Sequence, residues 1–98
     1  KWEFIEVENG NVVIKCPTRG YLVAGALINN VNYLGYHQFE KTASRFKIEP
    51  GHKGNSEGYK SYRWVTNNPR YANRFLGIWT DKFVIRGGTG EATSLKLN

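Results

Sequence analysis

The sequence predicts one small all-β domain, arranged as a small barrel, with a β-sandwich as the alternative. Its 98 residues are enough for a single domain with one modest core. No window shows helical periodicity, and the chain has no methionine and 11 glycines. Residues that favour strands (Val, Ile, Thr, Tyr, Phe and Trp) lie between turn signals that recur about every 8–12 residues. We therefore expect about ten short strands and no helix longer than about two turns.

The expected strands begin with a hairpin around Asn9-Gly10, a dipeptide that strongly favours a tight two-residue turn. Pro17 to Gly20 reads as the next turn, and Asn29-Asn30 bends residues 27–36 into a pair of strands. The other turns are expected at Pro50-Gly51 and at residues 67–69. The complete set of expected strands covers residues 2–7, 12–16, 21–24, 27–36 (as two strands), 46–48, 59–65, 75–79, 83–86 and 94–97.

Two glycine-rich segments are expected to be turns or loops. Residues 51–58 contain no apolar side chain and are typical of an exposed loop. Residues 87–90 read Gly-Gly-Thr-Gly, but the lysine and the helix of a phosphate-binding loop do not follow. We therefore interpret this segment as a tight turn.

The chain contains an internal repeat of roughly 50 residues. The segment from Gly20 to Glu49 is echoed between Arg74 and Leu97. The aligned pairs are Tyr21 with Phe75, Tyr33 with Phe83, and Phe46 with Leu95. The lead-in also repeats, because residues 2–7 before Asn9 resemble residues 45–50 before Gly51.

The repeat resembles that of β-trefoil proteins of the fascin and plant-agglutinin type, with an aromatic-Leu strand in its middle and an aromatic-x-aliphatic strand at its end. By this resemblance the core would contain Tyr21, Leu22, Phe46, Phe75, Leu76 and Leu95. The Gln-x-Trp signature of the ricin-type lectins is absent. A trefoil has three units, whereas this chain offers the tail of one and two more. The resemblance thus implies a homo-oligomer, a partner chain or a longer protein.

Positive charge is concentrated in the middle of the chain. The net charge is +6, and residues 41–74 carry eight Lys and Arg against two Glu. Such a segment attracts nucleic acid, acidic polysaccharide or a membrane surface, or serves only as a solvated face. The longest apolar run, residues 21–28, is far shorter than the ~20 residues that span a bilayer. No targeting signal is visible, so the compartment stays open.

The residues needed for catalysis are scarce. Acid-base chemistry would have to rely on Asp81, His37 and His52, and no nucleophile or metal-binding motif accompanies them. Cys16 is the only cysteine, which excludes an internal disulfide and favours a buried small side chain. We therefore expect no enzyme activity, no cofactor and no metal.

Ligand binding is better supported, because residues 59–79 interleave aromatic, arginine and asparagine side chains. Aromatic rings stack on sugars or bases, amides offer a donor and an acceptor, and guanidinium groups bind anions. Trp79 and Tyr36 are the first candidates for ligand contacts, because both lie at a strand end beside a turn. Tyr62 and Trp64 share a strand face, so both could instead belong to the core. The predicted ligand-binding residues are Tyr36, His37, Tyr59, Trp64, Asn67, Asn68, Arg70, Asn73 and Trp79.

The sequence thus predicts a non-catalytic, lectin-like module that binds carbohydrate, as the agglutinin resemblance also implies. One alternative is single-stranded nucleic-acid binding through residues 41–74. Another is a structural module that binds protein, as fascin-like trefoils bundle actin.

Overall fold

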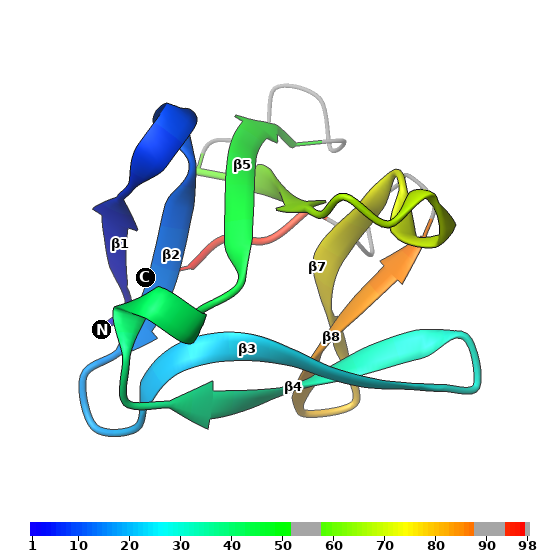
Figure 1. Cartoon of the computed structure of the whole chain (residues 1–98), viewed down its shortest axis with the longest axis horizontal. Coiled ribbons are helices and arrows are strands. Elements are labelled where there is room, and N and C mark those ends of the chain that lie inside the picture. The colour runs from blue at the N-terminus through cyan, green and yellow to red at the C-terminus, as the bar shows by residue number, and fades with distance from the viewer. Residues whose placement is uncertain (52–57, 88–93, 98) are drawn as a thin grey trace.

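The computed structural model describes residues 1–51, 58–87 and 94–97, and within them it confirms the all-β class (Figure 1). The helices of this part are three 3-10 turns of three residues each, and none is long and apolar enough to cross a membrane. The strands are β1 (Glu3–Glu6), β2 (Val12–Cys16), β3 (Gly20–Ile28), β4 (Val31–His37), β5 (Arg45–Pro50), β6 (Lys60–Val65), β7 (Arg74–Trp79) and β8 (Lys82–Gly87). The 3-10 turns are η1 (Glu8–Gly10), η2 (Glu40–Thr42) and η3 (Pro69–Tyr71).

The strands form a closed antiparallel barrel, which confirms the first of the two expected architectures. Their order is β1-β2-β3-β4-β8-β7-β6-β5, and β2 also pairs with β5 through Val12 and Phe46. This last pairing joins the two ends of the series, so seven strands close the barrel and β1 is added alongside β2. Because the barrel closes within one chain, an uncovered core is no longer a reason to expect a partner chain.

The sequence repeat corresponds to a structural repeat. The chain runs through two four-stranded meanders, β1–β4 and β5–β8, which meet where β4 pairs with β8. After the first meander, Phe46 pairs with Val12 at the start of β2. After the second, Leu95 pairs with Lys60 at the start of β6. The predicted equivalence of Phe46 and Leu95 is therefore confirmed by their pairing.

The number of strands is smaller than expected. Residues 20–28 form the single strand β3, whose pairing with β4 shifts register between Ala24 and Leu27 but does not end. The irregularity absorbs the extra residues, so one bent strand replaces two. Of the expected last strand, only Leu95 makes a bridge. The predicted turns are confirmed at Asn9-Gly10 and Asn29-Asn30, where all four residues have the positive φ that Asn and Gly tolerate. The second is a two-residue turn, whereas the first is a longer connection over residues 7–11 that contains η1.

The core of the barrel confirms five of the six expected core residues. These five are buried: Leu22, Phe46, Phe75, Leu76 and Leu95. Tyr21 is only half-buried, because neighbouring residues of a strand face opposite sides and Leu22 takes the inward position. The Lys15 ammonium lies 5.3 Å from the Tyr21 ring instead. The core prediction for Tyr21 was therefore wrong.

Two further side chains show where alternation alone could not decide. Tyr62 is buried and stacks on Phe4, with 5.7 Å between ring centroids. Trp64, two residues along, is half-buried at the margin of the core.

Cys16 is half-buried rather than buried, and its Sγ lies 3.6 Å from the Thr18 hydroxyl oxygen. This hydrogen bond lowers the pKa of the thiol.

An ion pair connects η1 to the start of β5. Arg45 Nε lies 3.0 Å from Glu8 Oε2, and Nη2 lies 3.1 Å from Oε1, a bidentate pair. The remaining nitrogen, Nη1, donates to the carbonyl oxygens of Glu40 and Ala43. Arg45 hydrogen bonds lower the pKa of the Glu8 carboxyl below its ordinary value of 4.5.

This ion pair predicts a pH-dependent contribution to stability. A carboxyl whose pKa is lower in the folded state stabilises the fold above its unfolded pKa, and this contribution is lost as the pH falls through the folded value. We expect Glu8→Gln to lower the free energy of unfolding by more at pH 7 than at about pH 3, because the contribution of the ion pair is lost as the carboxyl becomes protonated. Urea unfolding at both pH values measures it. Glu6→Gln, which removes an exposed carboxylate on β1, is the control, and an equal Glu8→Gln effect at both pH values would contradict the assignment.

Candidate ligand-binding pocket

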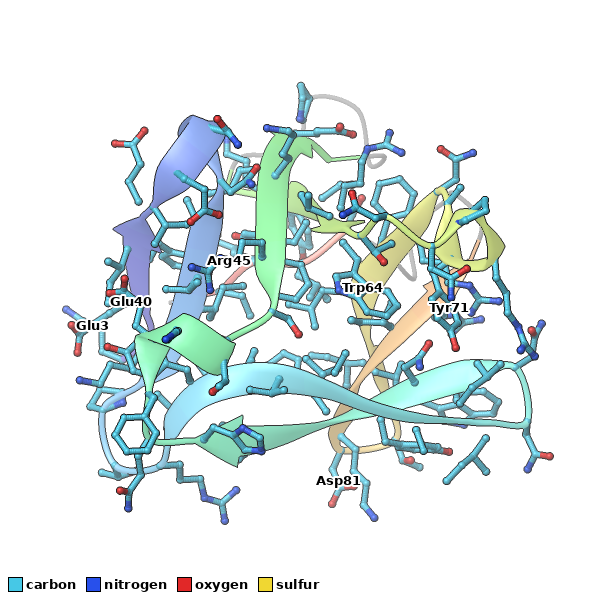
Figure 2. All side chains as sticks on the ribbon, in the orientation of Figure 1. Glu3, Glu40, Arg45, Trp64, Tyr71 and Asp81 are labelled. Carbon is cyan, nitrogen blue, oxygen red and sulfur yellow. The ribbon has the colours of Figure 1, made fainter. Side chains whose placement is uncertain are left out.

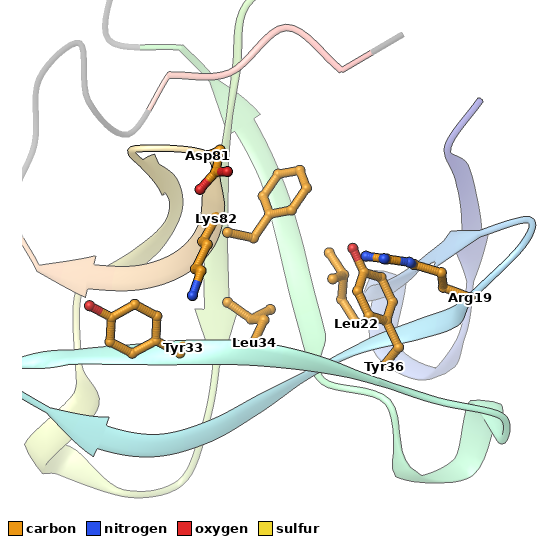
Figure 3. Close-up of a pocket in the computed structure, with 8 residues that line it drawn as sticks. Arg19, Leu22, Tyr33, Leu34, Tyr36, Asp81 and Lys82 are labelled. Atoms are coloured by element: carbon orange, nitrogen blue, oxygen red, sulfur yellow. The ribbon is translucent and has the colours of Figure 1, made fainter.

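A pocket opens where the barrel wall divides between β4 and β8. The two strands pair only through Asn32 with Ile85 and Tyr33 with Val84. Beyond Tyr33, β4 continues to His37 paired with β3, while the first residues of β8 pair with β7. The space between the diverging strands is a pocket of about 400 Å³ (Figure 3). Among the described strands, none pairs with the edge of β4 that faces this opening.

The pocket combines an apolar floor with a charged rim. Figure 3 shows Leu34 and Leu22 between Lys82 on one side and Arg19 with Tyr36 on the other. The complete lining is Arg19, Leu22, Tyr33, Leu34, Tyr36, Asp81, Lys82 and Phe83. Predominantly apolar and aromatic walls with a few polar groups are typical of small-ligand sites, whose volumes run from about 300 to 1,000 Å³. This pocket fits both criteria.

The charged rim comes from two turns that are far apart in the sequence. Arg19 belongs to the turn between β2 and β3, which is closed by its N–H donating to the Cys16 carbonyl at 3.2 Å. Its guanidinium carbon lies 5.3 Å from the centroid of the Tyr36 ring, a cation-π contact that restrains the side chain. Asp81 and Lys82 stand at the turn between β7 and β8.

These rim charges are not paired with one another. In the described part of the chain the ion pairs are Arg45 with Glu8 and Arg63 with Glu49, and neither includes a residue of the pocket. The charges of Arg19, Asp81 and Lys82 can therefore act on a ligand. The aromatic wall is held in place from behind, because Trp2 meets the Phe83 ring edge to face at 5.1 Å.

A second group of interest surrounds η3, and we call it the arginine cluster: Trp64, Arg70, Tyr71 and Arg74. The Trp64 and Tyr71 ring centroids lie 5.0 Å apart (Figure 2). The guanidinium carbons of Arg70 and Arg74 lie 6.0 and 5.8 Å from the Tyr71 centroid. Arg74 also donates to Asn30 in the turn between β3 and β4, at 2.8 Å to the carbonyl oxygen and 3.0 Å to Oδ1.

The asparagines near η3 have structural partners. Asn68 Oδ1 accepts a hydrogen bond from the Arg70 N–H and caps the 3-10 turn. Asn73 has a positive φ of 58°, and its Oδ1 accepts from Arg63 Nη1 at 2.8 Å. Asn67 is exposed in the same connection. A ligand at this place would therefore compete with existing contacts of Asn68 and Asn73.

The structure divides the predicted ligand-binding residues among several places. Five of them gather around η3: Trp64, Asn67, Asn68, Arg70 and Asn73. Tyr36 lines the pocket, while His37, the next residue along β4, lies 3.5 Å from the Thr42 hydroxyl through Nδ1. Trp79 is 48% exposed, with the Arg86 guanidinium 5.6 Å from its ring. Tyr59 is half-buried just before β6. The predicted loop at residues 51–58 and His52 lie mostly outside the described residues, as does the turn predicted at 87–90.

Sequence reasoning missed most of the pocket. Of its lining, only Tyr36 was predicted as a ligand contact. Arg19 and Lys82 are more than 60 residues apart, and only the β4–β8 pairing brings their turns to one opening. Tyr36 was the one local hint, because a tyrosine near a strand end beside a turn often meets solvent on one side.

The chain matches no known family model, curated protein or solved structure at a significant level. Within the described residues, no group of three or more His, Cys, Asp or Glu side chains is arranged to hold a metal ion.

Proposed function

We propose that this protein is a non-catalytic carbohydrate-binding module and that the pocket between β4 and β8 is its binding site. The observation that carries the proposal is the lining: three aromatic rings and two leucines enclose about 400 Å³ beneath a rim of charged groups that lack ion-pair partners among the described residues. Sugar rings present C–H faces that pack on such walls, and their hydroxyls need donors and acceptors at the edges.

The pocket groups suit separate parts of a sugar. Asp81 accepts hydrogen bonds from hydroxyls, whereas Lys82 and Arg19 donate to oxygen atoms. The Tyr33 and Tyr36 hydroxyls can do either. The edge of β4 beyond Tyr33 adds backbone groups that have no ladder partner on this side in the described sheet. Because most of the lining lies on paired strands, the site is formed before the ligand arrives, which limits the entropic cost of binding.

The test is a glycan array followed by titration of the best glycan into matched variants. We expect Asp81→Ala and Tyr33→Ala to weaken binding about tenfold or more, which corresponds to about 1.4 kcal/mol. Arg70→Ala in the arginine cluster is the matched control and should bind as the wild type does. The native mass should be measured first, because self-association would place several sites in one particle and raise the apparent affinity.

Two outcomes would contradict this proposal. A folded protein that gives no array signal at high concentration would exclude glycan binding as its main activity. Loss of binding in Arg70→Ala with no effect of the pocket variants would move the site to the arginine cluster.

The arginine cluster favours single-stranded nucleic acid as the second candidate ligand. Two guanidinium groups around one ring match a phosphate backbone better than a neutral sugar. Oligonucleotide binding that weakens steeply between ~50 and 200 mM salt would identify this function. Co-sedimentation with actin filaments would instead identify the structural module.

A further inference from the structure

The pocket is polar at both ends and apolar between them. Asp81 and Lys82 lie on one side, Arg19 lies on the other with Tyr36, and the two leucines separate them (Figure 3). A ligand that fills the pocket must therefore carry polar groups at two opposite ends and an apolar face in the middle. A sugar ring with a charged substituent on one side meets this description.

The two ends differ in what they can bind. The end with Asp81 and Lys82 offers one acceptor and one donor, which suits the hydroxyls of a sugar. The opposite end offers the guanidinium of Arg19, which forms no ion pair within the described chain. A planar guanidinium binds a carboxylate through two parallel hydrogen bonds, and this geometry is better matched than that of a single hydroxyl.

The Arg19 side chain is already restrained before an anionic ligand binds. Its contact with the Tyr36 ring restrains the side chain, so less rotamer freedom is lost when an anion binds. The pocket rim carries two cations and one carboxylate, and the whole chain has a net charge of +6. Both the local and the overall charge favour an anionic ligand over a neutral one.

We propose that the pocket binds an acidic sugar, with its carboxylate on Arg19 and its hydroxyls toward Asp81 and Lys82. This inference rests on the proposed carbohydrate-binding function and specifies the class of sugar. It also assigns Arg19 as the residue that distinguishes a uronic acid from the corresponding neutral hexose.

The experiment compares the methyl glycosides of glucuronic and galacturonic acid with those of glucose and galactose, by NMR titration at constant ionic strength. We expect the wild type to bind at least one uronide about tenfold more tightly than its neutral partner. Arg19→Gln should reduce that preference to about twofold or less while leaving neutral-sugar affinity nearly unchanged. Arg19→Lys, which keeps the charge but loses the planar fork, should be intermediate. Lys96→Gln removes an exposed positive charge outside the pocket and should keep the full preference.

The failures of the two proposals can be told apart. Equal affinity for uronides and neutral sugars would overturn the acidic-sugar inference and leave carbohydrate binding intact. A preference that persists in Arg19→Gln would overturn the role of Arg19. Tighter binding of glucose 6-sulfate than of any uronide would overturn the carboxylate assignment. No binding of any of these sugars, on a protein shown to be folded, would count against both proposals.

Discussion

Replacing Phe46 with alanine is expected to lower the free energy of unfolding by about 3–5 kcal/mol. The Phe46 side chain is fully buried in the barrel core, and the Phe46 backbone pairs with that of Val12 where β5 closes the barrel on β2. The substitution removes apolar contacts and leaves a cavity that the surrounding strands can fill only in part. Urea unfolding monitored by tryptophan fluorescence measures the change.

Phe39→Ala is the matched control for this prediction. Phe39 is 69% exposed between β4 and η2, and a surface substitution of this kind normally changes stability by no more than about 0.5 kcal/mol. If Phe46→Ala cost less than about 1 kcal/mol, the closing contact between β2 and β5 would not hold the barrel together.

Replacing Gly20 with alanine is expected to cost about 2–5 kcal/mol of stability. Gly20 opens β3 with a φ of +106°, which an L side chain rarely adopts, and an added Cβ would overlap the carbonyl oxygen of His37 on β4. The unfavourable φ costs about 1–2 kcal/mol, and relief of the overlap requires the backbone to shift at a cost of about 1–3 kcal/mol. Thermal unfolding should show the loss as a lower Tm.

Gly35→Ala provides the comparison on the strand opposite. A Cβ at Gly35 would meet no heavy atom within 4 Å, and its φ is not positive, so we expect little change in stability. Because Gly20 neighbours Arg19, the Gly20→Ala backbone shift should also weaken ligand binding in the pocket. A Gly20→Ala variant as stable as Gly35→Ala would contradict the close approach of β3 and β4 at this point.

Local features of the sequence accounted for much of the barrel. The turns at Asn9-Gly10 and Asn29-Asn30 were predictable because few other residues tolerate their backbone angles. The trefoil resemblance placed Tyr21, Leu22 and Leu76 in the core, and the two leucines are buried. It failed at Tyr21, since a large aromatic residue beside a leucine looks equally apolar and only the register with β4 decides which one faces inward.

The pocket could not be predicted in the same way. It exists because β4 and β8 separate after Tyr33 and Val84, and no local pattern marks the residue at which two distant strands stop pairing. The arginine cluster, by contrast, is formed mainly by neighbours in sequence. The long-range hydrogen bonds from Arg74 to Asn30 could not be predicted from the sequence.

The way in which the two meanders are closed bears on how the chain folds. Phe46 belongs to the second meander but pairs with Val12 of the first. Leu95 follows the last strand of the second meander and pairs with Lys60 at the start of β6. Neither meander therefore contains all the residues that complete its own pairing. A residue of the second meander closes the first, and β4 pairs with β8, so the barrel should gain its stability in one cooperative step rather than one half at a time.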